Sequence, residues 1–185
     1  LPYELHKEAR IANPELSPVV EFRGPAHDPI LQISLVARRN ARVEQTIFLV
    51  GDGETHIPPE YDDGAFRPSE ATVCVYAEEK TMLVAFCQAI LRLDPDILTG
   101  YNVTNFDMKY IWTRAALLGV PHALDWSRLE GYHCAMRQKI FKSRAFGSNE
   151  IYSFDIPGRV VFDLYQHMKK AHKLPSYKLD NVCAH

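Results

Sequence analysis

The period of the apolar positions changes along the chain and divides it into predicted strands and helices. The segment at 30–37 is rich in Ile, Leu and Val and predicts a buried strand, and two further strands are predicted at 43–50 and 72–77. Residues 51–70 are rich in turn-forming residues and predict a surface loop. Apolar residues recur at helical spacing from 78 to 93, behind two glutamates that suit the positive end of a helix dipole. A short strand ending at a glycine is predicted at 96–102, and an amphipathic helix at 107–118.

The second half of the chain carries weaker patterns. Residues 125–150 are mixed and basic, and the basic stretch at 137–144 favours a solvated loop, with contact to DNA phosphate as the alternative. The stretch "IYSFDIPGRVVFDLY" at 151–165 predicts two strands around a turn at "IPGR". Helical patterns follow at 164–172 and again after Pro175.

The order of these elements predicts a mixed α/β sheet. Strands that follow one another directly are expected to pair antiparallel, whereas the helix at 78–93 requires a crossover to a parallel strand. In sheets of this kind, ligands bind beyond the carboxyl ends of the parallel strands. Residues 102–107 follow such an end, so their polar side chains are the first candidates for a site.

Composition and charge narrow the chemistry of such a site. The chain has 185 residues, enough for one domain with a substantial core, and a formal net charge of −2. A basic field over the whole molecule is excluded, so binding of nucleic acid would need local patches or metal ions. Its four cysteines form no CxxC pair, which favours free thiols in a reducing compartment over a zinc site. No apolar run reaches about 20 residues, the length of a membrane span.

Two hypotheses explain Asp107, which follows an aromatic residue at the start of a predicted helix. A carboxylate in this place satisfies free N–H groups and the helix dipole, so capping is the interpretation that the local pattern favours. Asn102 and Asn105 are likewise typical of turns. The other hypothesis is a metal ligand in an enzyme that acts on nucleic acid. The local pattern alone leaves both hypotheses open.

Longer motifs on both sides of Asp107 add a resemblance. The stretch "DPDILTGYNVTNFDMKYI" at 94–111 resembles the second exonuclease motif of family B DNA polymerases, in which a strand ending in G-Y-N is followed, after three residues, by an aromatic residue and Asp. "FRGPAHDPILQIS" at 22–34 resembles the segment that leads into the second strand of that domain. "GRVVFDLYQHMKKAHKLPSYKLDNV" at 158–182 is similar to its later strand, helix and K-L-x-S-Y element. The three matches occur in the order of the family.

The resemblance implies a ribonuclease-H-like fold, a mixed sheet flanked by helices, with 3′→5′ proofreading exonuclease activity. Four carboxylates in this family hold two divalent ions that hydrolyse a phosphodiester bond, and oxygen ligands suit Mg²⁺ or Mn²⁺. By resemblance, Asp107 is a catalytic residue and a metal ligand. Asn102 and Phe106 then hold the terminal nucleotide at the 3′ end of single-stranded DNA. Packing in the core is the alternative for Phe106.

The sequence departs from the family pattern at the other metal carboxylates. The first motif, D-x-E, is absent ahead of residue 28, where only its glutamate is kept, at Glu8, Glu15 or Glu21. The third motif, Y-x-x-x-D, is expected beyond residue 182, and Tyr177 with Asp180 is one residue too short to be that motif. Asp163 matches an F-D-L position without an assigned metal role and is expected to be structural.

The extent of the matches predicts an irregular segment at 1–29 and an exonuclease-like domain at 30–185, truncated at both ends and lacking its C-terminal helix. The family implies a parent polymerase with palm, fingers and thumb domains, no membrane partner, and an intracellular place of action, either the nucleus or a viral replication site. With one metal carboxylate of four retained, this chain is expected to be inactive alone. Two other hypotheses are a degenerate ribonuclease-H-like module that scaffolds a polymerase, and a nuclease of the same fold outside the polymerases.

Overall fold

A computed structural model of the protein describes residues 24–51, 71–143 and 147–184. Outside these residues lie most of the predicted surface loop and three glutamates, Glu8, Glu15 and Glu21. Within the described residues, no helix is long and apolar enough to cross a membrane. Residues 24–29 form no helix or strand, and Tyr110 Oη donates a hydrogen bond of 2.7 Å to the carbonyl of Asp28.

The first sheet contains three strands in the order β1–β2–β3. Their bounds are close to the predicted runs: β1 (Gln32–Arg39), β2 (Arg42–Val50) and β3 (Ala71–Tyr76). β1 and β2 pair antiparallel, with Leu35 opposite Thr46. β2 and β3 pair in parallel, so the prediction that they pair antiparallel is wrong. The connection at 51–70 is long enough to explain this, because a parallel return needs a dozen residues or more.

Helix α2 (Glu79–Leu93) packs on this sheet and confirms the predicted helix at 78–93. Phe86 of α2 lies edge-on to Phe48 of β2, with 5.6 Å between the ring centroids, and 6.1 Å from the ring of Trp126. Asp94 follows the helix in the left-handed region, with φ 46°, and turns the chain toward the next strand. The apolar face of α2 is buried through Met82, Leu83, Phe86, Cys87, Ala89 and Ile90.

β4 (Ile97–Gly100) pairs in parallel with β7 (Val160–Asp163) and not with β3. The expected crossover through α2 therefore leads to a second, two-stranded sheet. Arg159, at the start of β7, fixes this pairing. Its side chain is 2% exposed and donates to the carbonyls of Trp126 and Pro95, both at 2.7 Å.

A long hairpin contains most of the basic stretch at 137–144 that the sequence predicts as a solvated loop. β5 (Ala135–Ser143) pairs antiparallel with β6 (Gly147–Asp155), so residues 137–143 of this stretch form a strand and the loop prediction is wrong for them. The pairing predicted across "IPGR" is also wrong, because β6 and β7 belong to different sheets. Polar residues on both faces of β5 hide the strand pattern, and the partner strand β6 supplies the stabilising contacts.

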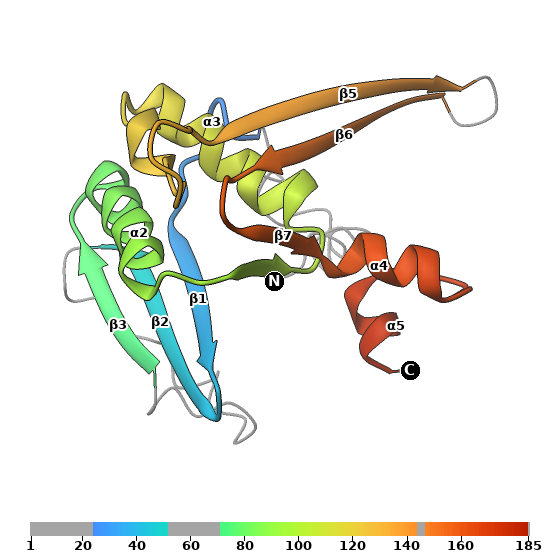
Figure 1. The fold of residues 1–185 in the computed structure, drawn as a ribbon, viewed down its shortest axis with the longest axis horizontal. Coiled ribbons are helices and arrows are strands. Elements are labelled where there is room, and N and C mark those ends of the chain that lie inside the picture. The colour runs from blue at the N-terminus through green and yellow to red at the C-terminus, as the bar shows by residue number, and fades with distance from the viewer. Residues whose placement is uncertain (1–23, 52–70, 144–146, 185) are drawn as a thin grey trace, which may run out of the picture.

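The remaining elements follow the strands closely in sequence. A π turn, η3 (Thr104–Met108), leads directly into α3 (Lys109–Leu117), and a short 3₁₀ turn, η4 (Pro121–Leu124), follows. α4 (Leu164–Ala171) and α5 (Leu179–Cys183) form the C-terminal part. In Figure 1 the β5–β6 hairpin extends past α3 and away from the first sheet. The mixed α/β architecture flanked by helices confirms the predicted fold class.

Candidate functional site

The candidate site begins where β4 ends and the chain turns toward α3. Gly100 allows a close approach there, since a Cβ atom at this position would lie 3.0 Å from Cβ of Val103, which is tighter than most Cβ contacts. Asn102 adopts the left-handed region with φ 58°, which asparagine tolerates better than most residues. The π turn that follows is closed by a bond of 2.8 Å from the Met108 N–H to the Val103 carbonyl. Turns of this kind are rare and often mark functional sites.

The buried carboxylate of Asp163 holds this turn in place. Oδ1 accepts hydrogen bonds from the N–H groups of Asn102 and Tyr165, at 2.9 and 3.0 Å. Oδ2 accepts from the N–H and the hydroxyl of Thr104, at 3.1 and 2.6 Å. Asp163 is thus the N-cap of α4 and at the same time the anchor of the loop after β4. Its role is structural, in agreement with the sequence.

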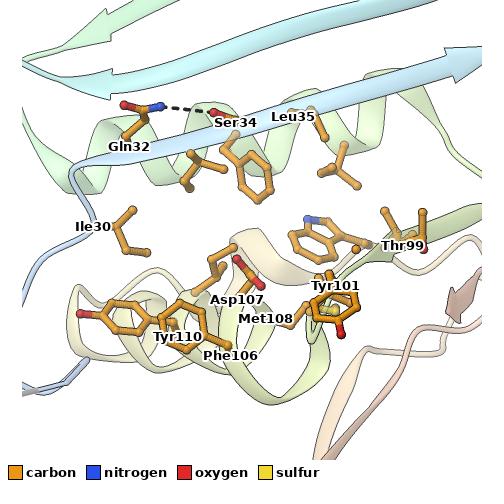
Figure 2. Close-up of a pocket in the computed structure, with 18 of the residues that line it drawn as sticks. Ile30, Gln32, Ser34, Leu35, Thr99, Tyr101, Phe106, Asp107, Met108 and Tyr110 are labelled. Atoms are coloured by element: carbon orange, nitrogen blue, oxygen red, sulfur yellow. Dashed lines mark hydrogen bonds between the residues drawn. The ribbon is translucent and has the colours of Figure 1, made fainter. Parts of the chain in front are cut away.

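Asp107 extends from the π turn into a cavity of about 690 Å³, named here the β1–β4 hollow. The start of β1, the end of β4, α2 and the π turn line this hollow, mostly with apolar side chains. Figure 2 shows Ile30, Ser34 and Leu35 on the β1 side of the hollow, and Asp107 with Phe106 on the side of the π turn. A carboxylate therefore stands in a largely apolar wall.

The surroundings raise the pKa of the Asp107 carboxyl group above the usual value for aspartate. The largest cause is the loss of water around the group, although the residue is open to the hollow, and the negative charge of Asp163 adds to the shift. A hydrogen bond from the backbone N–H of Asp107 partly opposes it. A cation beside Asp107 would lower this pKa, because an opposite charge favours the ionised form. In the absence of such a charge, the neutral form of Asp107 is favoured more than in an ordinary exposed aspartate.

Asp107 is not a helix cap. It is the fourth residue of the π turn, and α3 begins two residues later with Met108 as its N-cap. Neither Met108 nor Val103, the N-cap of the π turn, makes a side-chain capping bond. The N-cap role is therefore wrong for Asp107, although it is an acidic residue in the first turn of the helical segment, as the dipole argument expects. The role of metal ligand stays a prediction.

The two predicted nucleotide-binding residues occupy different places. Phe106 lines the hollow beside Asp107 and is 53% exposed, with its ring 6.0 Å from that of Tyr110. This exposure argues against packing in the core. Asn102 is half-buried in the turn behind the hollow and is not among the described residues that line it. The structure thus brings Phe106 and Asp107 together and leaves Asn102 to one side.

The hollow separates two strand edges. Among the described strands, β1 pairs only with β2, and β4 pairs only with β7, while both β1 and β4 line the hollow. A second cavity of about 900 Å³ continues between the far end of β1 and the start of β4. The open side of the site is therefore bounded by two strands that do not reach each other.

The described residues supply one carboxylate for a metal centre. In residues 24–51, 71–143 and 147–184, no group of three His, Cys, Asp or Glu side chains is placed to hold an ion. Asp163 is already engaged with its hydrogen-bond donors. Asp107 fits as one oxygen ligand of a hard divalent ion. The three candidate glutamates of the first motif lie outside the described residues.

Comparison with known proteins identifies the class of domain. A family model described as DNA polymerase family B, exonuclease domain, matches residues 16–182, which is most of the chain. The chain therefore belongs to this family. The matched range contains Asn102, Phe106 and Asp107, and it also contains Glu21 but not Glu8 or Glu15.

The similar curated proteins are whole polymerases. The DNA polymerase delta catalytic subunit of Dictyostelium discoideum is 32% identical over 165 residues, 89% of this chain and 14% of that protein. The corresponding subunit of Oryza sativa is also 32% identical over 165 residues. The DNA polymerase of Pyramimonas orientalis virus is 42% identical over 108 residues, 58% of this chain and 9% of that protein. The chain thus spans a small part of these relatives.

Sequence reasoning missed the π turn and the fourfold hydrogen bonding of Asp163. The sequence before α3 is compatible with an ordinary α-helix start, and no residue type in it indicates a π turn. For Asp163 a signal exists, because an aspartate between a strand and a helical pattern is a typical N-cap. Its bonds to Asn102 and Thr104 could not be found in this way, since they depend on the parallel pairing of β4 with β7.

Proposed function

We propose that this chain is the proofreading 3′→5′ exonuclease part of a DNA-directed DNA polymerase of family B that acts in DNA replication. The observation that carries the proposal is the presentation of Asp107 into the β1–β4 hollow, at the carboxyl end of a parallel strand, in a chain of this family. The raised pKa of the Asp107 carboxyl group supports it, because a divalent cation would relieve the cost of ionisation there.

Asp107 would be the catalytic metal ligand contributed by the described residues. Two Mg²⁺ or Mn²⁺ ions, when bound to the complete site, supply activation of water and stabilisation of the leaving oxygen. The exposed ring of Phe106 beside Asp107 suits stacking against the terminal base of a single-stranded DNA 3′ end. Asn102 would contact the same nucleotide from the turn behind the hollow.

The whole parent protein would join this domain to the palm, fingers and thumb of a polymerase. It would act inside the cell, in the nucleus or at a viral replication site. These proposals rest on the relatives, which are polymerases of eukaryotes and of a virus. We also propose that the chain is inactive alone, since the described residues contain one of the carboxylates that two ions require.

The test uses the parent polymerase and a single strand labelled at its 5′ end. With Mg²⁺ or Mn²⁺ the wild type is expected to shorten the strand from its 3′ end, and Asp107→Ala is expected to lower the rate about a thousandfold or more while DNA synthesis continues. Equal rates for the two proteins would refute the role of Asp107. For the chain alone, degradation that Asp107→Ala removes would refute the proposed inactivity.

A non-catalytic scaffold module is the second candidate, favoured by the lack of a three-ligand cluster among the described residues. The two candidates differ in metal binding. Calorimetric titration of the parent polymerase with Mn²⁺, with Asp107→Ala as reference, is expected to show sites that the variant lacks. Identical titrations together with absent degradation would instead establish the scaffold. A nuclease outside the polymerases would degrade DNA without any synthesis.

A further inference from the structure

The β5–β6 hairpin contacts one face of the segment formed by the π turn and α3. Asn105 Oδ1 accepts the N–H of Tyr152 at 3.1 Å. The ammonium group of Lys109 lies 4.2 Å from the centre of the Tyr152 ring, and the ring of Trp112 is 5.5 Å from that of Phe154. Asn105, Lys109 and Trp112 are spaced by four and three residues, so they share one face of the helical segment. Tyr152 and Phe154 are two residues apart, so they share one face of β6.

The hairpin and Asp163 hold neighbouring residues of the π turn. Asp163 binds Thr104 at the first position of the turn, and the hairpin binds Asn105 at the second. Phe106 and Asp107 follow immediately. A π turn holds one residue more than an α turn and is the less stable geometry, so it persists where neighbouring groups fix it. Relaxation by one residue would rotate the following side chains by roughly 100°.

We propose that Asn105 is a positioning residue for the nuclease reaction. Its hydrogen bond to the backbone of β6 keeps Thr104–Met108 in the π geometry and thereby directs Asp107 and Phe106 into the hollow. The hairpin pairs with no other described strand. Its contact with the π turn and α3 therefore also supports the residues of the site. This inference rests on the proposed exonuclease function.

The test compares Asn105→Ala with Asn105→Asp in the parent polymerase. Aspartate keeps an acceptor oxygen for the Tyr152 N–H, whereas alanine removes it. On a trinucleotide substrate with Mg²⁺, kcat is expected to fall about tenfold in Asn105→Ala with KM changed less than about twofold, because misplaced catalytic groups slow the chemical step. Asn105→Asp is expected to stay within about threefold of the wild type.

Two control variants separate positioning from a general loss of stability. Gln88→Ala removes an exposed amide on α2 and is expected to leave kcat unchanged. Val120→Ala removes methyl groups from a buried residue outside the hairpin and outside the lining of the hollow, and is expected to lower the melting temperature without changing kcat. A wild-type kcat for Asn105→Ala, or an increase confined to KM, would overturn the proposal.

Hydrogen exchange in this chain keeps the test independent of activity. In Asn105→Ala, amide exchange over residues 104–109 is expected to accelerate about tenfold relative to the wild type, with β1 and β2 unchanged. Unchanged exchange over 104–109 would overturn the inference. If the wild-type parent degrades no DNA, the proposed function fails; accelerated exchange would then still support the structural role of Asn105, and a role in the reaction would be excluded.

Discussion

The two sides of the candidate site differ in how they are built. On the β7 side, the carboxylate of Asp163 satisfies backbone and side-chain donors on the loop after β4. On the side that faces β1, Asp107 and Phe106 of the π turn border a hollow between two strand edges. The β7 side, called the closed side below, fixes the backbone of the turn. The side at the hollow, called the open side, exposes the side chains of Asp107 and Phe106. The difference indicates that hydrogen bonds within the protein hold the turn, whereas the carboxyl group of Asp107 lies in a largely apolar wall.

The largest expected effect tests whether the core below the hollow is closed to small reagents. Burial raises the pKa of the Cys87 thiol, on the inner face of α2, to about 12, while Cys183 is exposed. The thiolate is the reactive form, so at pH 8 Cys87 should react with iodoacetamide at least about a thousandfold more slowly than Cys183. Mass spectrometry of a time course measures the ratio. Comparable rates would show that the hollow opens into the core.

Removal of the anchor on the closed side should have the next largest effect. Asp163→Ala leaves three N–H groups and a hydroxyl without their acceptor and removes the cap of α4. We expect a loss of about 3 kcal/mol in the free energy of unfolding, measured by urea denaturation. Asp155→Ala is the matched control, because this exposed aspartate makes only a distant ion pair, at 3.4 Å to Arg137. Equal stability of the two variants would contradict the description of a closed side.

The contrast between the two sides also explains what the sequence could predict. The local apolar pattern predicts the strands of the first sheet and α2. The motif at 94–111 predicts β4 and singles out Asp107. The pairing of β4 with β7 joins residues 63 positions apart, such as Gly100 and Asp163, and no local period encodes it. The π turn was hidden for a similar reason, because contacts from β6 and β7 hold it.

The basic hairpin is a second element that the local sequence pattern does not predict. Lys139 and Arg137 alternate with other polar residues on β5, so the amphipathic period that marks a strand is missing. Its structure depends on the register with β6, where Gln138 lies opposite Tyr152. The residues of β1 were predictable as a strand. That β1 does not pair with β4 is visible only in the three-dimensional structure.

A smaller effect is expected at the point where the two sides meet. Tyr101 lines the hollow and donates its hydroxyl hydrogen to the carbonyl of Tyr177, which links the end of β4 to the C-terminal part. Tyr101→Phe removes this bond and leaves the ring in its edge-on contact with Tyr165, 5.5 Å away. We expect a loss of about 1 kcal/mol, measured by urea denaturation. A loss as large as that of Asp163→Ala would place the main anchor at Tyr101 instead.

The smallest expected effect has the opposite sign and concerns Asp107 itself. Its pKa is raised in the folded protein, so ionised Asp107 destabilises the fold at pH 7, and this cost arises as the pH increases from the unfolded value through the folded one. Asp107→Asn should therefore be more stable than the wild type at pH 7, by roughly 0.3 kcal/mol because the group is open to water. The difference should vanish near pH 3, where the carboxyl group is protonated in both states. Urea denaturation at the two pH values measures it, with Asp163→Asn, which should lose stability at pH 7, as the opposing control. A destabilised Asp107→Asn would show that Asp107, like Asp163, belongs to the closed side.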